Sequence, residues 1–308
     1  MKKRIVLTGA TGFIGANLVR ELVNLYDVHI LLRDKSQTTK LQDVLKKLTT
    51  HPYPLTDDKK LQKTLKQINP SYILHLATYE DYSDQTKLDE MISVNFLGLK
   101  NLLEASRNIP YECFINTGSS SEYGFKKEAM KETDPLEPIS FYATTKAAAT
   151  LLAYTYAKYY KKPIISFRLF SVYGPWENST RFIPSVITAG IKNKTISLTQ
   201  GPVRRDFIYI TDVVNAYKRA LVTNHIPGNI FNIGTGKQYT NREIVKTVAK
   251  IMHKKIGIHT VSYPRRIWDS SFWVADITKT KKKLRWHPQY NIEKGLAETI
   301  VWNQKEYQ

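Results

Sequence analysis

Residues 4–15, RIVLTGATGFIG, join a short apolar run to a glycine-rich turn. Beyond the turn, apolar residues recur at helical spacing, at Ile14, Leu18, Leu22 and Leu25. This order of strand, turn and helix is typical of a dinucleotide site, because glycines let the backbone approach a ligand closely and a helix N-terminus offers free N–H groups to a pyrophosphate. The stretch therefore predicts a dinucleotide-binding fold built on this turn.

The same alternation of strand and helix continues through the first half of the chain. Strand-like runs occur at 28–32, 72–77, 111–117 and 162–169, and helical patterns lie at 61–68, 88–105 and 141–160. Alternation of this length predicts an α/β fold with a doubly wound parallel sheet. Beyond residue 173 the rhythm is less regular. We expect a Rossmann domain over 1–171, to which 207–236 returns, and a smaller, interleaved substrate-binding lobe over 172–308.

The residue after the second strand indicates which dinucleotide is bound. An acidic side chain about 20 positions past the glycine turn holds the ribose hydroxyls of NAD. Arg33 takes this place, and Asp34 comes next. An arginine suits the additional phosphate of NADP, whereas Asp34 keeps NAD open. We therefore expect NADP(H) in preference to NAD(H).

Composition narrows the class of protein. The chain of 308 residues has 42% hydrophobic and 24% charged residues, which is ordinary for a globular protein. Its one cysteine, Cys113, excludes an internal disulfide and favours the cytoplasm. No apolar run approaches the roughly 18 residues that would span a membrane.

The net charge of +19 raises the question of nucleic acid. The lysines are scattered along the chain and do not form one stripe interleaved with aromatic residues. We expect a Lys-rich surface around an anionic small-molecule site, and no nucleic-acid partner. His75 lies between apolar residues and is interpreted as a packed core histidine, so no metal site is expected.

Tyr142 and Lys146 are the candidate catalytic pair. The run from Phe141 to Tyr160 lacks Pro and Gly and predicts a helix, on which residues four apart share one face. A phenol is a poor acid near neutral pH, because its unperturbed pKa is about 10. A fixed ammonium nearby favours the phenolate and lowers that pKa. The pair could then exchange a proton with a sugar hydroxyl or ketone, although such pairs also occur on ordinary helix surfaces.

A series of motifs, in one order along nearly the whole chain, gives these features a context. They are TGATGFIG at 8–15, HLA at 75–77, Asn95 with Gly98 before NLLEA, SSSEYG at 119–124, YATTK at 142–146, RLFSVYGP at 168–175, RRDFIYITD at 204–212 and FNIGTG at 231–236. In these motifs the chain resembles the extended short-chain dehydrogenase/reductases, and specifically their nucleotide-sugar epimerase/dehydratase family.

The resemblance implies roles for particular residues. The residues that it places against the cofactor are Gly9, Thr11, Gly12, Phe13, Ile14, Gly15, Leu76, Ala77 and Asn95. Tyr142 becomes the acid/base, and Lys146 holds the ribose and tunes the phenol. Ser119 matches the Ser or Thr that hydrogen-bonds the reacting sugar oxygen, and Ser120 is the alternative. The aspartate expected near the adenine is replaced by Pro54, which leaves that contact to the backbone around Leu55.

The resemblance also implies a site for a nucleoside-diphosphate sugar. Arg205, and Arg266 with Asp269, match substrate-nucleotide ligands, and a guanidinium fits the oxygens of a diphosphate. Arg181 is a further candidate. The asparagine that commonly touches the substrate is Ser171 in this chain. Relatives pair through the helices expected at 88–105 and 141–160, so we expect a homodimer.

Departures from the family pattern narrow the expected reaction. The 4,6-dehydratases place a pair that ends in Glu directly after the Ser or Thr, whereas Ser120 and Ser121 stand there in this chain and Glu122 comes one position later. Together with Arg33, this favours a reductase of a 4-keto-6-deoxy sugar that consumes NADPH once. The alternatives are a 4-epimerase that keeps its NAD, a dehydratase with Glu122 shifted into place, and a non-catalytic NADP(H)-binding module.

Overall fold

The computed structural model describes residues 2–33, 36–79, 87–224, 226–261 and 269–306. The chain divides into two compact units. Unit 1 comprises Met1–Gly124, Pro135–Leu169 and Val214–Phe231. Unit 2 comprises Phe125–Asp134, Phe170–Val213 and Asn232–Gln308. Each unit is therefore built from segments that are distant in the sequence.

A seven-stranded sheet carries unit 1, with the strand order β11-β6-β5-β4-β1-β2-β3. The strands are β1 (Arg4–Thr8), β2 (Asp27–Leu32), β3 (Thr49–Pro52), β4 (Tyr72–His75), β5 (Cys113–Ser119), β6 (Ile164–Leu169) and β11 (Ile230–Ile233). All pairs from β3 to β6 are parallel. After β3 the chain crosses to the other side of β1 and adds β4 there. This order is that of a doubly wound sheet and confirms the predicted fold class.

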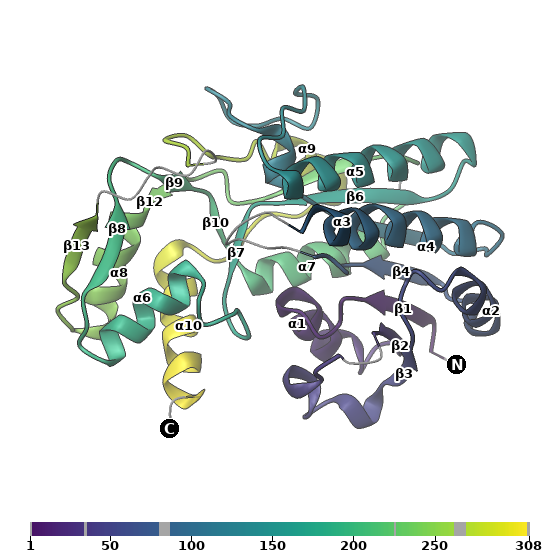
Figure 1. Ribbon diagram of the computed structural model, residues 1–308, viewed down its shortest axis with the longest axis horizontal. Coiled ribbons are helices and arrows are strands. Elements are labelled where there is room, and N and C mark those ends of the chain that lie inside the picture. Colours follow the sequence, from purple (N-terminus) through teal and green to yellow (C-terminus); the bar gives the residue numbers. More distant parts are fainter. Residues whose placement is uncertain (1, 34–35, 80–86, 225, 262–268, 307–308) are drawn as a thin grey trace. The chain divides into compact units, whose positions relative to one another are not determined.

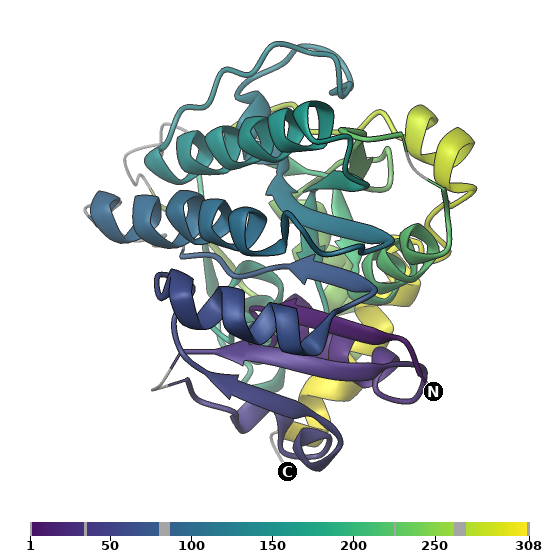
Figure 2. The same cartoon turned by 90° about the vertical axis from the view of Figure 1, so that its right-hand side faces the viewer.

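Helices cover both faces of this sheet, as Figure 1 and Figure 2 show. On one face lie α2 (Asp58–Ile68), α4 (Gly98–Ser106) and α5 (Phe141–Tyr159), and on the other lie α1 (Phe13–Leu22) and α7 (Ile210–Leu221). Strands β4 and β6 are buried along their whole length, because parallel strands that are covered on both faces turn no side to water. The side of α5 that faces the sheet is rich in alanine, which lets this long helix lie close to β5 and β6.

The helix expected at 88–105 is interrupted. It begins as α3 (Leu88–Met91), continues as a π-helical stretch, Ile92–Leu97, and ends as α4. A π-helical turn contains an additional residue, and such turns occur frequently at functional sites. In this chain the turn contains Asn95, which is buried.

Among its described residues, unit 2 contains α6 (Phe182–Ile191), α8 (Asn241–Met252), α9 (Thr278–Leu284) and α10 (Ile292–Glu306). Short strands pair beside them. The pairs are β7 (Ser171–Tyr173) with β10 (Phe207–Tyr209), β8 (Ile196–Thr199) with β13 (Ile258–Val261), and β9 (Arg204–Arg205) with β12 (Tyr239–Thr240). The first two pairs are parallel and the third is antiparallel.

Asp206 holds several loops of unit 2 together. Its buried carboxylate accepts hydrogen bonds from the N–H and the hydroxyl of Thr235, and from the N–H groups of Gly236 and Ala275. A Cβ on Gly234 would lie 2.9 Å from Asp206 Oδ2. Gly234 of the FNIGTG motif therefore leaves room for a buried carboxylate that accepts several backbone N–H groups.

Two differences from the expected domain ranges are clear. Residues 125–134 group with unit 2, and the segment that returns to unit 1 is 214–231, whereas we expected 207–236. The edge strand β3 was not expected, because its sequence TTHP is polar and short.

Within the described residues, no helix combines the length and the hydrophobicity needed to cross a membrane.

Candidate active site

The turn between β1 and α1 leaves no room for a side chain at Gly9 or Gly15. Gly9 has a φ of +72°, and a Cβ there would lie 2.6 Å from backbone atoms of Leu76 and Ala77. A Cβ on Gly15 would lie 2.2 Å from the carbonyl oxygen of Gly9. Glycine is needed at both positions so that the turn, α1 and the segment after β4 can lie against one another.

The N-terminus of α1 is open to an anion. Gly12 is the N-cap, no side chain caps the helix, and its first turn contains no acidic residue. Gly12 is exposed, and Thr11, Phe13 and Ile14 are partly exposed. Free N–H groups and the positive end of the helix dipole would hold the pyrophosphate of a dinucleotide here. The turn therefore fits the cofactor class that the sequence predicted.

Thr8 and His75 join the ends of β1 and β4. Thr8 Oγ1 accepts hydrogen bonds from the N–H groups of Leu76 (3.2 Å) and Ala77 (3.1 Å), and it lies 2.9 Å from His75 Nδ1. Because these two bonds occupy both lone pairs, the hydroxyl proton points to Nδ1, and His75 carries its own proton on Nε2. Burial, and then the charge of Lys146, lowers the pKa of His75 to about 3. His75 is therefore a neutral histidine of the core.

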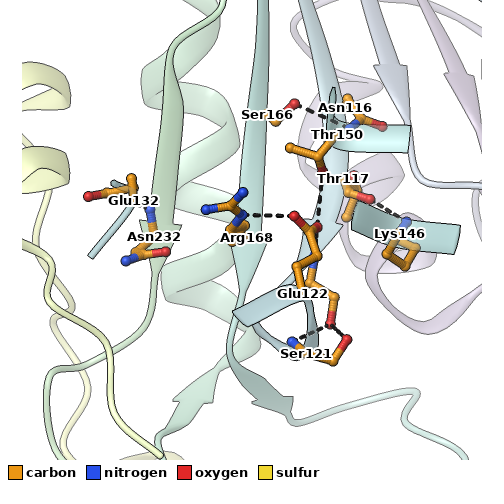
Figure 3. A network of polar contacts seen from close by, with 11 residues as sticks. Asn116, Thr117, Ser121, Glu122, Glu132, Lys146, Thr150, Ser166, Arg168 and Asn232 are labelled. Carbon is orange, nitrogen blue, oxygen red and sulfur yellow. Dashed lines mark hydrogen bonds and ion pairs between the residues drawn. The ribbon is translucent and has the colours of Figure 1, made fainter. Parts of the chain in front are cut away.

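Tyr142 and Lys146 stand on consecutive turns of α5. Ser140 caps this helix by accepting the N–H of Ala143 at 3.1 Å, which places Tyr142 in the first turn. Tyr142 is partly exposed, and Lys146 is buried. The ammonium of Lys146 donates a hydrogen bond to the backbone carbonyl of Thr117 on β5 (Figure 3). A fixed cation thus lies one helical turn after the phenol.

The side chain of Asn95 is used entirely by the protein. Its Oδ1 accepts hydrogen bonds from the hydroxyl of Thr78 (3.0 Å) and the N–H of Tyr79 (2.7 Å). Its Nδ2 donates to the carbonyl of Tyr79 and the hydroxyl of Thr145, both at 3.0 Å. A primary amide has two donor hydrogens and two acceptor lone pairs, so these contacts leave none for a cofactor. The side chain of Asn95 thus links the segment after β4 to α5, and the place of Asn95 beside a cofactor stays a prediction.

Ser119 ends β5 and precedes a short 3-10 helix, Ser120–Tyr123. Its hydroxyl accepts the N–H of Ser121 at 3.2 Å and lies 2.7 Å from the hydroxyl of Ser121. Ser119 is partly exposed, whereas Ser120 is buried. Accessibility therefore favours Ser119 over Ser120 as the serine of the reaction.

Glu122 is turned into the interior, where its exposed fraction is 0%. Its carboxylate accepts hydrogen bonds from the N–H of Ser119 (2.8 Å), the hydroxyl of Thr150 (3.0 Å) and Nε of Arg168 (2.8 Å). Figure 3 shows the contacts with Thr150 and Arg168. Burial raises the pKa of Glu122, and Arg168 and the other donors oppose this rise. A carboxylate held in this way is not accessible to a substrate. Glu122 is therefore not the shifted carboxylate of a dehydratase.

Leu55 and Arg33 are the residues expected at the adenosine end of the cofactor. The carbonyl of Leu55 accepts a hydrogen bond from Asn101 Nδ2 at 3.0 Å. Arg33 follows β2 and is exposed. Its N–H donates to the hydroxyl of Ser36 at 3.0 Å, and its carbonyl accepts the N–H of Ser36 at 2.9 Å. Asp34 lies outside the described residues.

In unit 2, Arg205 is held between an aromatic ring and a carboxylate. Its guanidinium carbon lies 5.1 Å from the centroid of the Trp273 ring, and its Nη2 lies 3.8 Å from Asp269 Oδ1. Burial lowers the pKa of Arg205, and the charge of Asp269 opposes this change. The structure thus brings Arg205 and Asp269 together and orients the guanidinium through Trp273.

The other expected substrate residues are more dispersed. Ser171 opens β7 and donates its N–H to the carbonyl of Asp206 at 2.9 Å. Arg181 is the N-cap residue of α6, and its Nε lies 3.9 Å from Glu177 Oε1. Arg266 lies outside the described residues.

Across the part of the chain that the structure describes, no group of His, Cys, Asp or Glu is arranged to hold a metal ion.

Arg168, Asp206 and Trp273 support these sites and were not singled out from the sequence. For two of them a signal exists: Arg168 lies inside the apolar run SFRLF, and Asp206 directly precedes the apolar run FIYI. A charge within or beside a buried strand must find a counter-charge or several donors, so it indicates a polar network. Trp273 carries no comparable signal, because an aromatic residue in a loop is usually core.

The comparisons with known proteins agree with this geometry. The model of the NAD dependent epimerase/dehydratase family matches residues 5–234. An uncharacterised UDP-glucose epimerase of Bacillus subtilis is 27% identical over 319 residues, which cover 99% of each chain. The structure of UDP-glucuronic acid 4-epimerase from Bacillus cereus, in complex with UDP-glucuronic acid and NAD, is 26% identical with a TM-score of 0.89, over 99% of this chain and 100% of that chain. The structure of dTDP-glucose 4,6-dehydratase from Bacillus anthracis, in complex with NAD, is 26% identical with a TM-score of 0.86, over 98% of this chain and 97% of that chain.

The expectation of NADP(H) is wrong. The matching family is NAD dependent, and both similar structures contain NAD. Arg33 agrees with this, because its side chain is exposed and its contacts with Ser36 are made by the backbone, so these contacts do not hold the guanidinium in place for a phosphate. Because the family model matches residues 5–234, most of the chain, the chain belongs to the NAD-dependent epimerase/dehydratase family.

Proposed function

We propose that the protein is a 4-epimerase of a nucleoside-diphosphate hexose, and that it keeps its NAD through the reaction. The Bacillus subtilis and Bacillus cereus relatives are named as epimerases of UDP sugars. The observation that favours an epimerase over a dehydratase is the burial of Glu122, whose carboxylate binds Arg168 in the interior and is not exposed beside Ser119, Ser120 and Ser121.

This position argues against a dehydratase. Elimination across C5 and C6 needs an acid/base carboxyl group beside the sugar. Ser120 and Ser121 occupy the places where dehydratases of the family carry that group, and a serine hydroxyl takes up a proton far less readily than a carboxylate does at neutral pH. Glu122 is occupied by three donors in the interior. The groups that remain serve oxidation and reduction at C4.

In the proposed mechanism, the residues of unit 1 move one proton and hold one oxygen. Bound NAD supplies the chemistry of taking a hydride from C4 and returning it to the other face of the sugar. Tyr142 takes the proton of the 4-hydroxyl in the first half of the reaction and gives it back in the second. The ammonium of Lys146, fixed by Thr117, favours the phenolate form of Tyr142. The hydroxyl of Ser119 donates to the same sugar oxygen and keeps it within reach of the phenol.

Arg205 is the proposed ligand of the substrate diphosphate. Its planar guanidinium matches phosphate oxygens, and stacking on Trp273 limits the orientations that it can take. A diphosphate that stays bound would let the keto sugar present its other face before reduction. The net charge of +19 would also raise the rate at which an anionic substrate arrives.

The alternative, a reductase of a 4-keto-6-deoxy sugar, stays a prediction. Such an enzyme consumes one NADPH in each turnover, whereas the matching family is NAD dependent and the similar epimerase structure contains NAD. The two reactions differ in a measurable way. A reductase oxidises one cofactor for each product, whereas an epimerase leaves the amount of NAD unchanged.

We also propose that two chains pair through the region of α4 and α5. Large apolar side chains are exposed on or beside these helices, at Leu97, Phe141, Leu151, Tyr154 and Tyr159. Apolar side chains that gather on the surface of a globular protein mark interaction sites. Light scattering at micromolar concentration should give the mass of two chains. A single-chain mass at every concentration would refute the dimer.

The proposed function is tested with the purified protein and defined sugars. Mass spectrometry of the denatured protein should identify NAD as the bound cofactor. The protein is then incubated with UDP-glucose, UDP-glucuronate or UDP-N-acetylglucosamine, and the products are identified by proton NMR. An epimerase yields the C4 epimer of one of them with no net reduction of NAD. A 4-keto-6-deoxy product, or the stoichiometric oxidation of added NADPH, would overturn the proposal.

A further inference from the structure

The buried pair of Glu122 and Arg168 links the candidate serine to the helix that carries the candidate phenol. We infer that this pair is a positioning group, which fixes the place of Ser119 relative to Tyr142. The inference rests on the proposed role of Ser119 and adds to it two residues that do not touch the substrate.

The contacts of Glu122 go beyond those of an ordinary helix cap. A glutamate at the third position of a helix commonly accepts the N–H of its own N-cap residue, here Ser119, and such a glutamate usually lies at the surface. In this chain the same carboxylate also accepts the hydroxyl of Thr150 on α5 and Nε of Arg168 on β6. The guanidinium of Arg168 in turn lies 4.5 Å from the centroid of the Tyr123 ring. Three elements of unit 1 therefore meet at one carboxylate.

These contacts connect Ser119 with one stripe of α5. Tyr142, Lys146 and Thr150 follow one another at intervals of four, so they lie along the same side of the helix. Lys146 is joined to β5 through the carbonyl of Thr117, and Thr150 donates a hydrogen bond to Glu122 (Figure 3). Glu122 in turn accepts the N–H of Ser119 at the end of β5. Two sets of hydrogen bonds thus fix the end of β5 against the side of α5 that carries Tyr142.

The residue before Ser119 makes this arrangement possible. A Cβ on Gly118 would lie 2.4 Å from Oε1 of Glu122 and 2.9 Å from the hydroxyl of Thr150. Any side chain at position 118 would therefore displace the carboxylate. The space beside Ser119 is shaped for Glu122.

Stability alone does not account for the pair. Both side chains are almost fully buried, and taking two charges out of water offsets much of what their attraction contributes. Replacing a buried ion pair by apolar residues of similar volume is often neutral for stability, or even stabilising. What an apolar pair could not supply is a directed acceptor for the N–H of Ser119. This acceptor is the feature that a positioning role explains.

The test replaces Glu122 and Arg168 by apolar residues and compares this variant with one in which a different carboxylate is removed. The main variant is Glu122→Met with Arg168→Met, which removes both charges together and leaves neither one unpaired. The control is Glu132→Gln, because Glu132 is partly buried and also accepts a backbone N–H, that of Asn232 at 2.9 Å, but within unit 2. Figure 3 labels both residues. Both variants are also made in a Ser119→Ala background.

Three measurements follow for each variant. Thermal unfolding of the paired variant should stay within a few degrees of wild type. Deuterium exchange of the amides in 119–123 should be at least about tenfold faster than in wild type, and unchanged in the control. The rate of NADH formation on mixing NAD-loaded protein with its sugar should fall at least about tenfold, with the same Kd for NAD. In the Ser119→Ala background, replacing Glu122 and Arg168 should change the rate of NADH formation less than about twofold, because Glu122 acts through Ser119.

The outcomes separate this inference from the proposed function. Unchanged exchange at 119–123, or an equal loss of rate with and without Ser119, would overturn the inference. A wild-type protein that converts no nucleotide sugar refutes the epimerase, and the exchange measurement then still decides whether Glu122 holds Ser119. If the paired variant does not fold, Gly118→Ala takes its place. It keeps both charges and displaces the carboxylate, and the same results are expected of it.

Discussion

Nδ1 of His75 lies 2.9 Å from Oγ1 of Thr8. Because that oxygen accepts two backbone N–H groups, we infer that its own proton faces Nδ1. A second proton on Nδ1 would face the first, so the contact exists only while His75 is neutral. The same hydroxyl accepts the N–H groups of Leu76 and Ala77, which lie against the glycine turn. The charge state of one core histidine is thereby coupled to the packing of the cofactor turn.

The first prediction concerns stability in acid. The pKa of His75 is about 3 in the folded protein, against about 6.5 in the unfolded chain. The unfolded chain therefore binds one more proton between these values, and the free energy of unfolding falls with decreasing pH by about 1.4 kcal/mol per unit. His75→Gln should remove this part of the slope. Denaturant unfolding of both proteins between pH 4 and 7 checks it, and parallel curves would contradict the prediction.

The second prediction concerns the phenol. Tyr142→Phe should lower the rate of epimerisation by roughly 10²–10⁴-fold, because it removes the proton that the reaction exchanges, and should leave the Kd for NAD within about twofold. Tyr26→Phe, on a tyrosine outside the candidate site, serves as the control and should keep the wild-type rate. A Tyr142→Phe protein as active as wild type would favour a non-catalytic cofactor-binding module.

The third prediction concerns the residue that misled the choice of cofactor. Arg33→Ala should leave the Kd for NAD within about twofold, since the exposed side chain of Arg33 takes no part in its contacts with Ser36. Binding is measured by titration calorimetry of the cofactor-free protein with NAD and with NADP. A loss of affinity confined to NADP would restore the phosphate-reading role that the sequence suggested.

The parts of the fold that the sequence predicted are those with a local cause. Glycines at 9, 12 and 15 and the helical spacing that follows them predicted β1, the turn and α1, because both signals act within about twenty residues. The long run without Pro or Gly predicted α5 to within one residue at its end. Such patterns do not depend on the rest of the molecule.

What the sequence did not show depends on contacts between distant segments. The strands of unit 2 that contain two or three residues, such as β9 and β12, carry no periodicity, and their loops are held by Asp206. Asn95 matched a cofactor position, yet only its three-dimensional surroundings show that Tyr79 and Thr145 use its amide. A buried polar residue looks the same in sequence whether it faces a ligand or the protein.

The fourth prediction concerns the substrate side. Trp273 lies against the guanidinium of Arg205, and a cation–π contact of this kind contributes about 0.5–2 kcal/mol. Trp273→Leu should therefore raise the Kd for UDP about threefold to thirtyfold, while the Kd for NAD stays the same. Trp302→Leu is the control, because it makes the same change at a tryptophan that packs edge-on against the ring of Trp176 and has no contact with Arg205 among the described residues. Calorimetry with UDP and with NAD separates the two effects. An equal loss for both ligands would mean that Trp273 supports the fold and does not orient Arg205.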